Sequence, residues 1–404
     1  MVATTYALTA AALAGLAVAQ PVKTYSGSFS VHQVRNNNYR AHGPSAMAKA
    51  YLKFGAPLPE HLSKYVKVPK TYRRDNTTGG SGSETTTPVG PYDIEYLTPV
   101  SIGTPAQTLN LDFDTGSSDL WVFSTETDAS SVQNNQVLYD PSKSSTSKEV
   151  SGSTWMISYG DGSTSSGNVY TDTVNVGGVT VSGQVVESAK TVSDSFATGD
   201  SDGLLGLAMS SINTVTPTPA KTWFDNAISG LDVAAFTADL KYHTAGTYDF
   251  GVVDDSKYTG ELSYVDVDDS QGFWNFKAEV DGTSTEGIAD TGTTLLLIDD
   301  EIVTSYYSQV DGAKNSQADG GYVFSCDATL PDFTFTAGDA TITIPGEYIN
   351  YAPADEAGTS CYGGIQSSAD IGINIFGDVA LKAAFVVFDL STGSPRLGWA
   401  NKDL

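Results

Sequence analysis

The sequence predicts an all-β protein of two similar lobes separated by a deep cleft. Three observations support this prediction: an abundance of Gly, Ser, Thr, Val and Tyr, many short segments in which apolar and polar residues alternate, and an internal repeat around two Asp-Thr-Gly triplets. With 404 residues the chain also exceeds one ordinary domain, so two lobes and additional leading segments can be accommodated.

The internal repeat is the strongest feature of the sequence. In each copy a mostly apolar run leads into Asp-Thr-Gly and then a hydroxyl residue, and the aspartates Asp114 and Asp290 are 176 positions apart. A second motif, an apolar pair followed by glycine, ends at Gly206 and Gly377, which lie 92 and 87 positions after their respective aspartates. Because glycine allows another backbone to approach closely, we expect this motif to cross behind each Asp-Thr-Gly loop and hold it rigidly.

The chain begins with segments that differ from the rest. Residues 1–19 combine an Ala- and Leu-rich apolar run with a small-x-small ending at Ala19, which predicts a signal peptide and export from the cell. Residues 20–84 are basic and include an amphipathic helix expected at 46–54 with two lysines. The Gly, Ser and Thr of residues 75–90 are typical of a linker.

Charge also divides the chain. Residues 20–89 hold ten basic and three acidic side chains, whereas residues 90–404 hold 11 basic and 44 acidic ones, a net charge of −33. An acidic body argues against nucleic acid or anionic membranes as partners and favours a protein that functions at acid pH. Plain solubility explains the charge equally well. A basic segment before an acidic body suggests a pro-segment that lower pH releases; the alternative is a disordered basic tail without an inhibitory role. Crowded carboxylates repel one another, so we predict that folding stability falls as the pH rises toward neutral.

Regular alternation begins near residue 96 and predicts the secondary structure of the body. The strands are expected at Tyr96–Gly103, Thr108–Phe113, Ser166–Val176, Val179–Ala189, Thr247–Val253, Thr334–Ile344 and Ala384–Asp389. Short helices are expected near Pro219–Gly230 and Asp299–Val310, and no transmembrane run follows the leader.

The repeated triplets can carry acid–base chemistry. If Asp114 and Asp290 meet between the lobes, both cannot ionise cheaply and they share one proton. The ionised carboxylate can then take a proton from a bound water while its protonated partner donates to a carbonyl oxygen, which hydrolyses a peptide bond without a covalent intermediate. The neighbouring residues support the pair by leaving room for the water, by donating to the carboxylates and by joining the two loops: Gly116 and Gly292, Ser117 and Thr293, and Thr115 and Thr291.

Other chemistries lack the necessary residues. Of the four histidines, His32, His42, His61 and His243, only the last lies in the body, so neither a serine or cysteine triad nor a histidine-rich metal site is supported. Glycosidases also use paired carboxylates, but that chemistry gives no reason for the repeated Thr-Gly context. The purely structural alternative is that each aspartate caps a strand-to-turn junction.

Three motifs identify a family. Residues 113–117 are Phe-Asp-Thr-Gly-Ser, residues 289–293 are Ala-Asp-Thr-Gly-Thr, and residues 156–163 are Met-Ile-Ser-Tyr-Gly-Asp-Gly-Ser. The body of the chain resembles pepsin-type aspartic proteases, and within them the secreted branch of filamentous fungi represented by aspergillopepsin and penicillopepsin. The resemblance implies a bilobal pepsin-like acid protease fold in which Asp114 and Asp290 are the catalytic pair, with no cofactor and no metal.

The resemblance also implies a mobile hairpin over the cleft, the flap, with Tyr159, Gly160 and Asp161 at its tip. Tyr before Gly-Asp-Gly is itself a hairpin turn signal. Trp121 matches the indole whose N–H positions the hydroxyl of the flap tyrosine in this family, although core packing alone also explains a tryptophan there. In fungal relatives an Asp at the position of Asp161 accompanies acceptance of a basic side chain, because a carboxylate can pair a Lys. We therefore expect cleavage between large apolar residues, with Lys tolerated before the scissile bond.

Two further features follow from the resemblance. The basic segment becomes an inhibitory pro-segment, one of whose lysines contacts the catalytic pair, with Lys64, Lys67 and Lys70 as candidates. The residues alone leave Cys326 and Cys361 open between a disulfide and two buried thiols, and the resemblance matches them to the single C-lobe disulfide of this branch.

We therefore expect four segments: a signal peptide at 1–19, a pro-segment at 20–84, an N-terminal lobe at 85–257 and a C-terminal lobe at 258–404. The expected protein is a secreted, extracellular and monomeric aspartic endopeptidase, made as a zymogen and active at acid pH. Its expected partners are polypeptide substrates bound in extended form, its own pro-segment and pepstatin-like inhibitors, whereas nucleic acid and membranes are not expected. The alternative is a catalytically silent relative that binds a peptide or protein in the same cleft.

Overall fold

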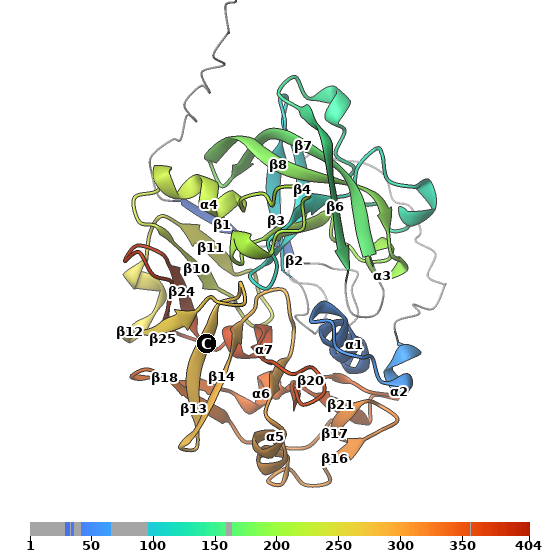
Figure 1. Cartoon of the computed structure of the whole chain (residues 1–404). Helices are drawn as coiled ribbons and strands as arrows, with labels where there is room; N and C mark the ends of the chain where they lie inside the picture. The colour runs from blue at the N-terminus through green and yellow to red at the C-terminus, as the bar shows by residue number, and fades with distance from the viewer. Residues whose placement is uncertain (1–28, 33, 36–41, 66–95, 159–163, 356) are drawn as a thin grey trace, which may run out of the picture.

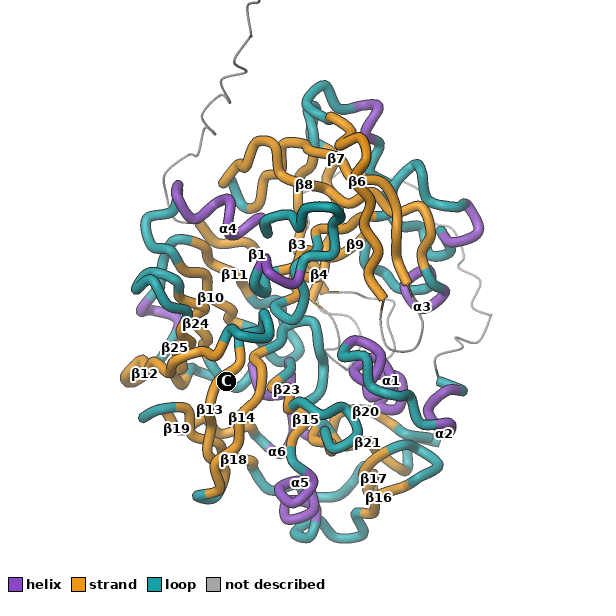
Figure 2. The backbone as a smooth tube through the Cα atoms, viewed as in Figure 1, coloured by secondary structure: helices purple, strands orange, loops and turns teal. Residues whose placement is uncertain are grey.

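Two β-rich lobes make up the fold, and the helix α1 (Gly43–Lys53) lies between them on one side (Figure 1). This computed structural model describes residues 29–32, 34–35, 42–65, 96–158, 164–355 and 357–404. Strands dominate both lobes and the helices between them are short (Figure 2). The all-β, bilobal fold class predicted from the sequence is therefore confirmed.

Three sheets hold the described strands. The eight-stranded sheet runs in the order β2 (Val34–Arg35), β3 (Tyr96–Ile102), β4 (Gln107–Asp114), β9 (Gly203–Gly206), β5 (Leu120–Val122), β8 (Val179–Val192), β7 (Thr164–Val176) and β6 (Lys148–Ser158). The thirteen-stranded sheet runs in the order β1 (Phe29–His32), β11 (Thr247–Phe250), β10 (Ala235–Asp239), β24 (Phe385–Asp389), β25 (Arg396–Asn401), β12 (Thr259–Asp268), β13 (Asn275–Val280), β14 (Thr283–Ala289), β23 (Asn374–Phe376), β15 (Leu296–Ile298) and β22 (Ile365–Ser367), with β18 (Phe333–Ala337) and β19 (Ala340–Ile344) attached at β13. The four-stranded sheet runs in the order β16 (Lys314–Ser316), β17 (Gly321–Ser325), β21 (Ser360–Gly363) and β20 (Asn350–Pro353).

Short helices connect these sheets. Besides α1 they are α2 (Glu60–Ser63), α3 (Asp194–Ala197), α4 (Trp223–Ala227), α5 (Asp300–Tyr307), α6 (Gly346–Ile349) and α7 (Asp378–Leu381). The predicted helices near residues 219–230 and 299–310 correspond to α4 and α5. No helix in the described part of the chain has the length and apolar character needed to cross a membrane.

The predicted strands appear with small differences at their ends, and one needs correction. The segment Thr334–Ile344 was expected to be a single strand, but it forms the antiparallel pair β18 and β19. The chain turns back between them at Gly338, which adopts a φ of +61°. This left-handed conformation is accessible to glycine without steric cost, so the glycine ends one strand and permits the next.

Strand β4 shows why an apolar alternation positions the site. Leu109, Leu111 and Phe113 point to one face of the strand and are 0% exposed. Burying side chains of this size contributes about 1.5–3 kcal/mol each. The register of β4 is therefore strongly specified, because a slip of one residue would turn all three side chains toward the other face. The residue that follows Phe113, Asp114, is thus held at a fixed place.

The two cysteines form a disulfide. Cys326 and Cys361 are 35 residues apart in sequence and are bonded to each other, beside the paired strands β17 and β21. The expected disulfide is confirmed, and the alternative of two buried thiols is wrong. A link across a loop of this length typically stabilises a domain by a few kcal/mol, about 4 kcal/mol by loop-entropy arguments.

The described parts of the predicted pro-segment are integrated into the fold. β1 extends the thirteen-stranded sheet by pairing with β11, and β2 pairs with β3. Helix α1 follows these two strands along the chain. It confirms the helix expected at 46–54, although it begins earlier, at Gly43. These described residues are therefore ordered parts of the protein, which argues against the alternative of a disordered tail.

Helix α1 has recognisable start and stop signals. The side chain of His42 caps its first turn by accepting a hydrogen bond from the backbone N–H of Ser45 at 3.2 Å, and Pro44 occupies the first turn. Gly55, with a φ of +69°, follows the last turn. The Tyr51 hydroxyl donates to Asp370 Oδ2 at 3.1 Å, which ties the middle of α1 to the C-terminal half of the chain.

Candidate active site

The two aspartates of the repeat occupy equivalent places in the two lobes. Asp114 is the last residue of β4. This strand runs parallel to β9, and Asp114 pairs in register with Gly206 of β9. Asp290 directly follows β14, which runs parallel to β23. In each lobe a further strand, β5 or β15, lies antiparallel to β9 or β23. The repeat seen in the sequence is thus a repeat of local topology.

Glycines of the second motif lie directly behind the aspartate loops. A Cβ atom added at Gly206 would lie 2.6 Å from the backbone nitrogen of Asp119, and one added at Gly377 would lie 2.2 Å from the carbonyl oxygen of Thr293. Real Cβ atoms do not approach backbone so closely, so a side chain at either position would displace the loop. The glycines therefore permit the close crossing that the sequence predicted.

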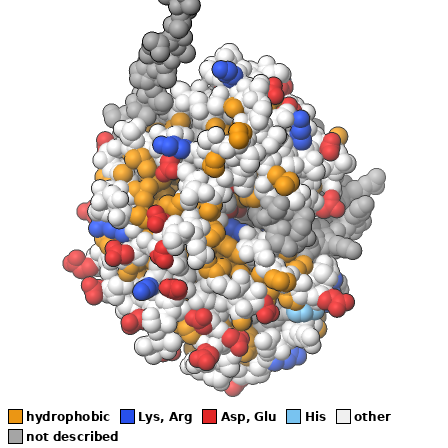
Figure 3. All heavy atoms as spheres, viewed as in Figure 1, with side chains coloured by type: hydrophobic (Ala, Val, Ile, Leu, Met, Phe, Trp, Pro, Cys, Tyr) orange, Lys and Arg blue, Asp and Glu red, His pale blue; other side chains and the backbone are white. Residues whose placement is uncertain are grey.

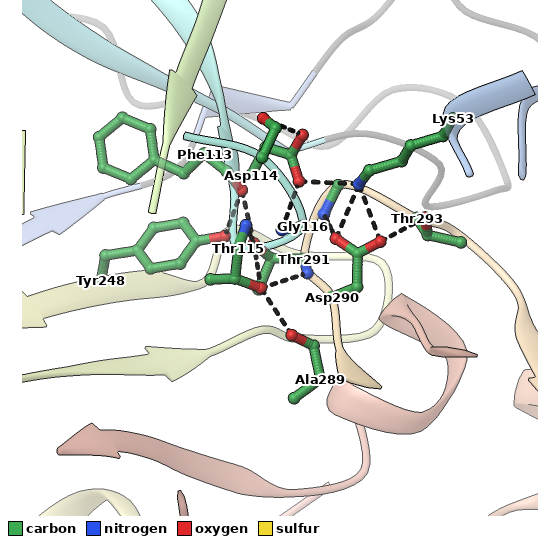
Figure 4. Close-up of polar contacts among 12 residues, drawn as sticks. Lys53, Phe113, Asp114, Thr115, Gly116, Tyr248, Ala289, Asp290, Thr291 and Thr293 are labelled. Carbon is green, nitrogen blue, oxygen red and sulfur yellow. Dashed lines mark hydrogen bonds and ion pairs between the residues drawn. The ribbon is translucent and has the colours of Figure 1, made fainter. Parts of the chain in front are cut away.

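The two loops are joined by their threonines. The backbone N–H of Thr115 donates to Thr291 Oγ1 at 3.1 Å, and the backbone N–H of Thr291 donates to Thr115 Oγ1 at 3.0 Å. Each hydroxyl then donates across the interface, that of Thr115 to the Ala289 carbonyl at 2.8 Å and that of Thr291 to the Phe113 carbonyl at 2.6 Å (Figure 4). All of these groups are buried, so the bonds fix one loop against the other.

Each carboxyl group receives two donors from its own loop. Asp114 Oδ1 accepts from the backbone N–H of Gly116 at 2.8 Å, and its Oδ2 accepts from Ser117 Oγ at 2.7 Å. Asp290 repeats this pattern with the residues of its own loop, accepting from Gly292 N at 3.0 Å and Thr293 Oγ1 at 2.6 Å. Donors of this kind favour the ionised carboxylate.

The glycines of the triplets also leave the space between the carboxyl groups open. A Cβ atom at Gly116 would lie 2.7 Å from Asp290 Oδ1, and one at Gly292 would lie 2.4 Å from Asp114 Oδ1. Any larger residue would push against the carboxyl group of the opposite lobe. The structure therefore brings together all eight residues that the sequence assigned to the pair and its support.

A lysine of the predicted pro-segment occupies the space between the two carboxyl groups. Lys53, the last residue of α1, places Nζ 2.7 Å from Asp114 Oδ1 and 2.8 Å from both carboxylate oxygens of Asp290. Figure 4 shows its ammonium group reaching between the two aspartates. The lysine side chain is 12% exposed and the aspartates 1% and 0%, so the three charges meet almost out of water.

The lysine alters the charge state of both aspartates. Burial raises the pKa of the Asp114 carboxyl, but the Lys53 ammonium and the loop donors outweigh it and leave that pKa below its ordinary value. Burial, together with the charge of Asp114, keeps the pKa of the Asp290 carboxyl above its ordinary value even though Lys53 opposes this. Burial lowers the pKa of Lys53, yet the two carboxylates raise it well beyond its usual range, so the lysine is charged.

The lysine at the catalytic pair is not among the three candidates taken from the sequence. Lys64 lies away from the aspartates, where its ammonium group donates to the Ala318 carbonyl at 3.1 Å and covers the ring of Tyr65. The other two candidates, Lys67 and Lys70, fall outside the described residues. The usable signal was the predicted helix itself, because Lys53 stands at its C-terminal end, where a long side chain can extend beyond the helix.

A small cavity lies beside Asp114, between α1 and the N-terminal lobe. It has a volume of about 120 Å³ and apolar walls that include Trp121, Phe196 and Leu204. Trp121 is 1% exposed and stacks on Trp155 with ring centroids 6.1 Å apart. Its indole N–H has no hydrogen-bond partner among the described residues.

The hairpin expected to form the flap is described only in its strands. Its tip residues, Tyr159, Gly160 and Asp161, lie outside the described residues, although the hairpin strands β6 and β7 on either side are present. The role expected for Trp121 toward the flap tyrosine therefore stays a prediction.

Comparisons with known proteins agree with this geometry. Residues 95–402 match the family model described as "Eukaryotic aspartyl protease". The chain is 56% identical to endothiapepsin from Cryphonectria parasitica, with 98% of each chain covered. It is 51% identical to penicillopepsin-1 from Penicillium rubens, over 95% of this chain and 94% of the relative.

A solved structure extends the similarity to the fold. The crystal structure of an aspartic proteinase from Irpex lacteus superposes with a TM-score of 0.62 at 26% identity, over 77% of this chain and 95% of that one. The chain therefore belongs to the eukaryotic aspartyl protease family, and it is an aspartic endopeptidase related to those of filamentous fungi.

Proposed function

We propose that this chain is made as a secreted, inactive precursor in which the pro-segment blocks Asp114 and Asp290, the catalytic pair. The observation that supports this proposal is the position of Lys53 Nζ, within 2.8 Å of both carboxyl groups. A cation there neutralises the pair and fills the place that an attacking water needs. The helix that carries it also walls the cavity next to Asp114, where a substrate side chain would be bound.

Once the lysine has left, the pair can hydrolyse peptide bonds. With one proton shared between them, the ionised carboxylate accepts a proton from water as the water attacks the peptide carbonyl. The protonated partner donates its proton to the carbonyl oxygen, and return of a proton to the amine completes cleavage. The tight hydrogen bonds between the loops hold the two groups in place, so little reorganisation is needed during the reaction.

The proposal is tested with the full chain, denatured haemoglobin and pepstatin. We expect no cleavage at pH 7, cleavage after incubation in acid, and complete loss of that cleavage when pepstatin is added. Acid cleavage that resists pepstatin would contradict the assignment to a shared-proton pair. Protein that has lost residues 20–84 yet cleaves nothing at any pH would instead support the silent, peptide-binding alternative.

Release of the pro-segment should depend on pH in a defined direction. Lys53 favours the ionised form of both aspartates, so the docked state binds fewer protons than the released state. Docking is therefore stabilised above the pKa values of the free pair and weakened as the pH falls through them, in the range below about pH 5. Carboxylates on the protein surface, which Figure 3 shows spread over this face, should also weaken docking in acid, because their protonation removes charges that attract a basic segment.

Pepstatin binding to the full chain measures this release directly, because inhibitor and lysine compete for the same carboxyl groups. We expect no binding by calorimetry at pH 7 and increasing binding below about pH 5. Equal binding at both pH values would show that the lysine does not control access.

We also propose that the enzyme prefers large apolar residues on both sides of the scissile bond and accepts Lys before it. The apolar walls of the cavity beside Asp114 support the first preference, and the carboxylate of Asp161 is the expected partner of the lysine. Asp161→Ser should lower cleavage after Lys relative to cleavage after Phe by about tenfold or more, as measured with paired peptides. An unchanged ratio would remove Asp161 from the explanation.

The proposed export and processing are tested by determining the N-terminal sequence of the protein before and after activation. Protein recovered from the culture medium should begin at Gln20 before activation and within about ten residues of position 85 afterwards. A precursor that retains residues 1–19 would contradict the signal peptide.

A further inference from the structure

Two buried carboxyl groups behind the Asp114 loop have no part in the mechanism described above. Asp119 and Glu187 are each 1% exposed. Asp119 stands at the end of the loop that begins with Asp114, directly before β5, and Glu187 lies in β8 where it pairs in register with Trp121 of β5. Because β5 and β8 are adjacent, the two side chains lie close together behind the Asp114 loop.

A dense set of hydrogen bonds surrounds Asp119. Its Oδ1 accepts from the backbone N–H of Thr214 at 3.0 Å, from the Thr214 hydroxyl at 2.7 Å and from Asn213 Nδ2 at 3.3 Å. Its backbone carbonyl accepts from Gly206 N at 3.0 Å. Asp119 therefore joins the Asp114 loop both to β9 and to the segment around residue 214.

Glu187 shares one of these donors. Asn213 Nδ2 also donates to Glu187 Oε1 at 3.0 Å and to the Ser118 carbonyl at 3.1 Å. Glu187 Oε2 receives no hydrogen bond from any described residue. One amide, that of Asn213, lies within hydrogen-bond distance of both groups and so places the two carboxyls close together, and two carboxyl groups can share a hydrogen bond only when one of them carries a proton.

The surroundings indicate which group is protonated. Burial and the neighbouring charge of Asp119 raise the pKa of Glu187 well above its ordinary value. Burial also raises the pKa of Asp119, but the donors on Thr214 and the bond to Glu187 oppose this. Donors favour an ionised group, and Asp119 has more of them, so we assign the charge to Asp119 and the proton to Glu187.

No cation compensates this pair. Neither carboxyl forms an ion pair with a lysine, arginine or histidine in the described part of the chain. The titratable groups that act on the pair are the two carboxyls themselves and Asp114, while the adjoining segments contribute Asn213, Thr214 and Trp121. A second negative charge would therefore be buried without a partner.

We propose that Asp119 and Glu187 are positioning residues that share one proton, and that loss of this proton as the pH rises displaces the Asp114 loop and inactivates the protein. Because folding keeps the proton on Glu187 above its ordinary pKa, the folded chain binds more protons than the unfolded chain in that range. Stability then falls as the pH rises. The loss of stability toward neutral pH, which the overall charge also predicts, would then originate in this one pair of carboxyl groups.

The test uses Glu187→Gln in the full chain. Glutamine cannot ionise, but its amide can still donate to Asp119 and its carbonyl oxygen can still accept from Asn213. Wild-type and variant protein are held at pH 5 to 9, and the thermal midpoint and the activity regained in acid are measured. We expect the pH of half-loss to rise by about one unit or more in the variant.

The matched control is Glu149→Gln, which removes the same charge from an exposed position on β6 of the same lobe. It should leave the pH of half-loss within about 0.2 unit of wild type. An equal shift in both variants would attribute the effect to net charge, and no shift in Glu187→Gln would overturn the proposal. If Glu187→Gln does not fold, Asp119→Asn makes the same test, since it removes the same repulsion while keeping the acceptor for Thr214. Thermal midpoints do not depend on proteolysis, so the outcome stands apart from that of the proposed zymogen.

Discussion

Exchange of Asp290 for asparagine is expected to lower kcat about a thousandfold or more, and exchange of Asp114 is expected to do the same. An amide cannot serve as acid or base, and it leaves the remaining carboxyl without a partner for the shared proton. Geometry should survive, because an asparagine oxygen can still accept from the loop donors at Gly292 or Gly116. Activity on a peptide substrate is measured after the pro-segment has been removed in trans by the wild-type enzyme.

Asp281→Asn provides the matched control for these exchanges. Asp281 is exposed in the turn between β13 and β14 of the same lobe, and its φ of +49° suits asparagine equally well. This variant should keep its kcat within about twofold of wild type. If either dyad variant retained a tenth of wild-type activity, the assigned chemistry would have to be abandoned.

Exchange of Lys53 for methionine should release the active site at a pH where the wild-type precursor is inert. The change removes three contacts of 2.7 to 2.8 Å and leaves two buried carboxyls facing an apolar side chain. Breaking a buried ion pair from one side costs about 3–5 kcal/mol, which corresponds to roughly a hundredfold or greater shift toward the released state. Pepstatin affinity of the full chain at pH 6 is the measurement, and we expect it to rise by that factor.

Lys64→Met serves as the control, because Lys64 is one of the three lysines expected from the sequence, while the structure places its ammonium group on the Ala318 carbonyl. It should leave pepstatin affinity at pH 6 unchanged within about threefold. A strong response to Lys64→Met with none to Lys53→Met would falsify the docking seen here.

Much of the fold and the aspartate site was predictable because those features are local or repeated. The Asp-Thr-Gly triplets recur with the same apolar context, and Gly206 and Gly377 recur at nearly the same offset, so the two copies support each other. Alternation within β4 specifies which side chains are buried and hence where Asp114 emerges. The turn at Gly338 was missed because the runs on both sides of it alternate, although the buried positions change there from odd residue numbers in β18 to even ones in β19.

Features that depend on packing between distant segments were not predictable. Lys53 is one of several lysines in a basic segment, and its position is decided by how α1 packs between the lobes rather than by its neighbours in sequence. The meeting of Asp119 with Glu187 depends on the pairing of β5 with β8 across more than sixty residues. Neither contact can be recognised from the local amino-acid composition or from the spacing of apolar residues.

The contacts between the two aspartate loops have a twofold symmetry. Each bond from Thr115 to the other loop has a counterpart from Thr291, and the paired distances of 3.1 and 3.0 Å are nearly equal, as in the isologous interface of a homodimer. These symmetric hydrogen bonds act on both carboxyl groups alike, so they cannot decide which carboxyl group holds the shared proton. That choice must arise from neighbours that break the symmetry: the Asp119–Glu187 pair behind Asp114, and the single buried carboxyl of Asp378 near Asp290.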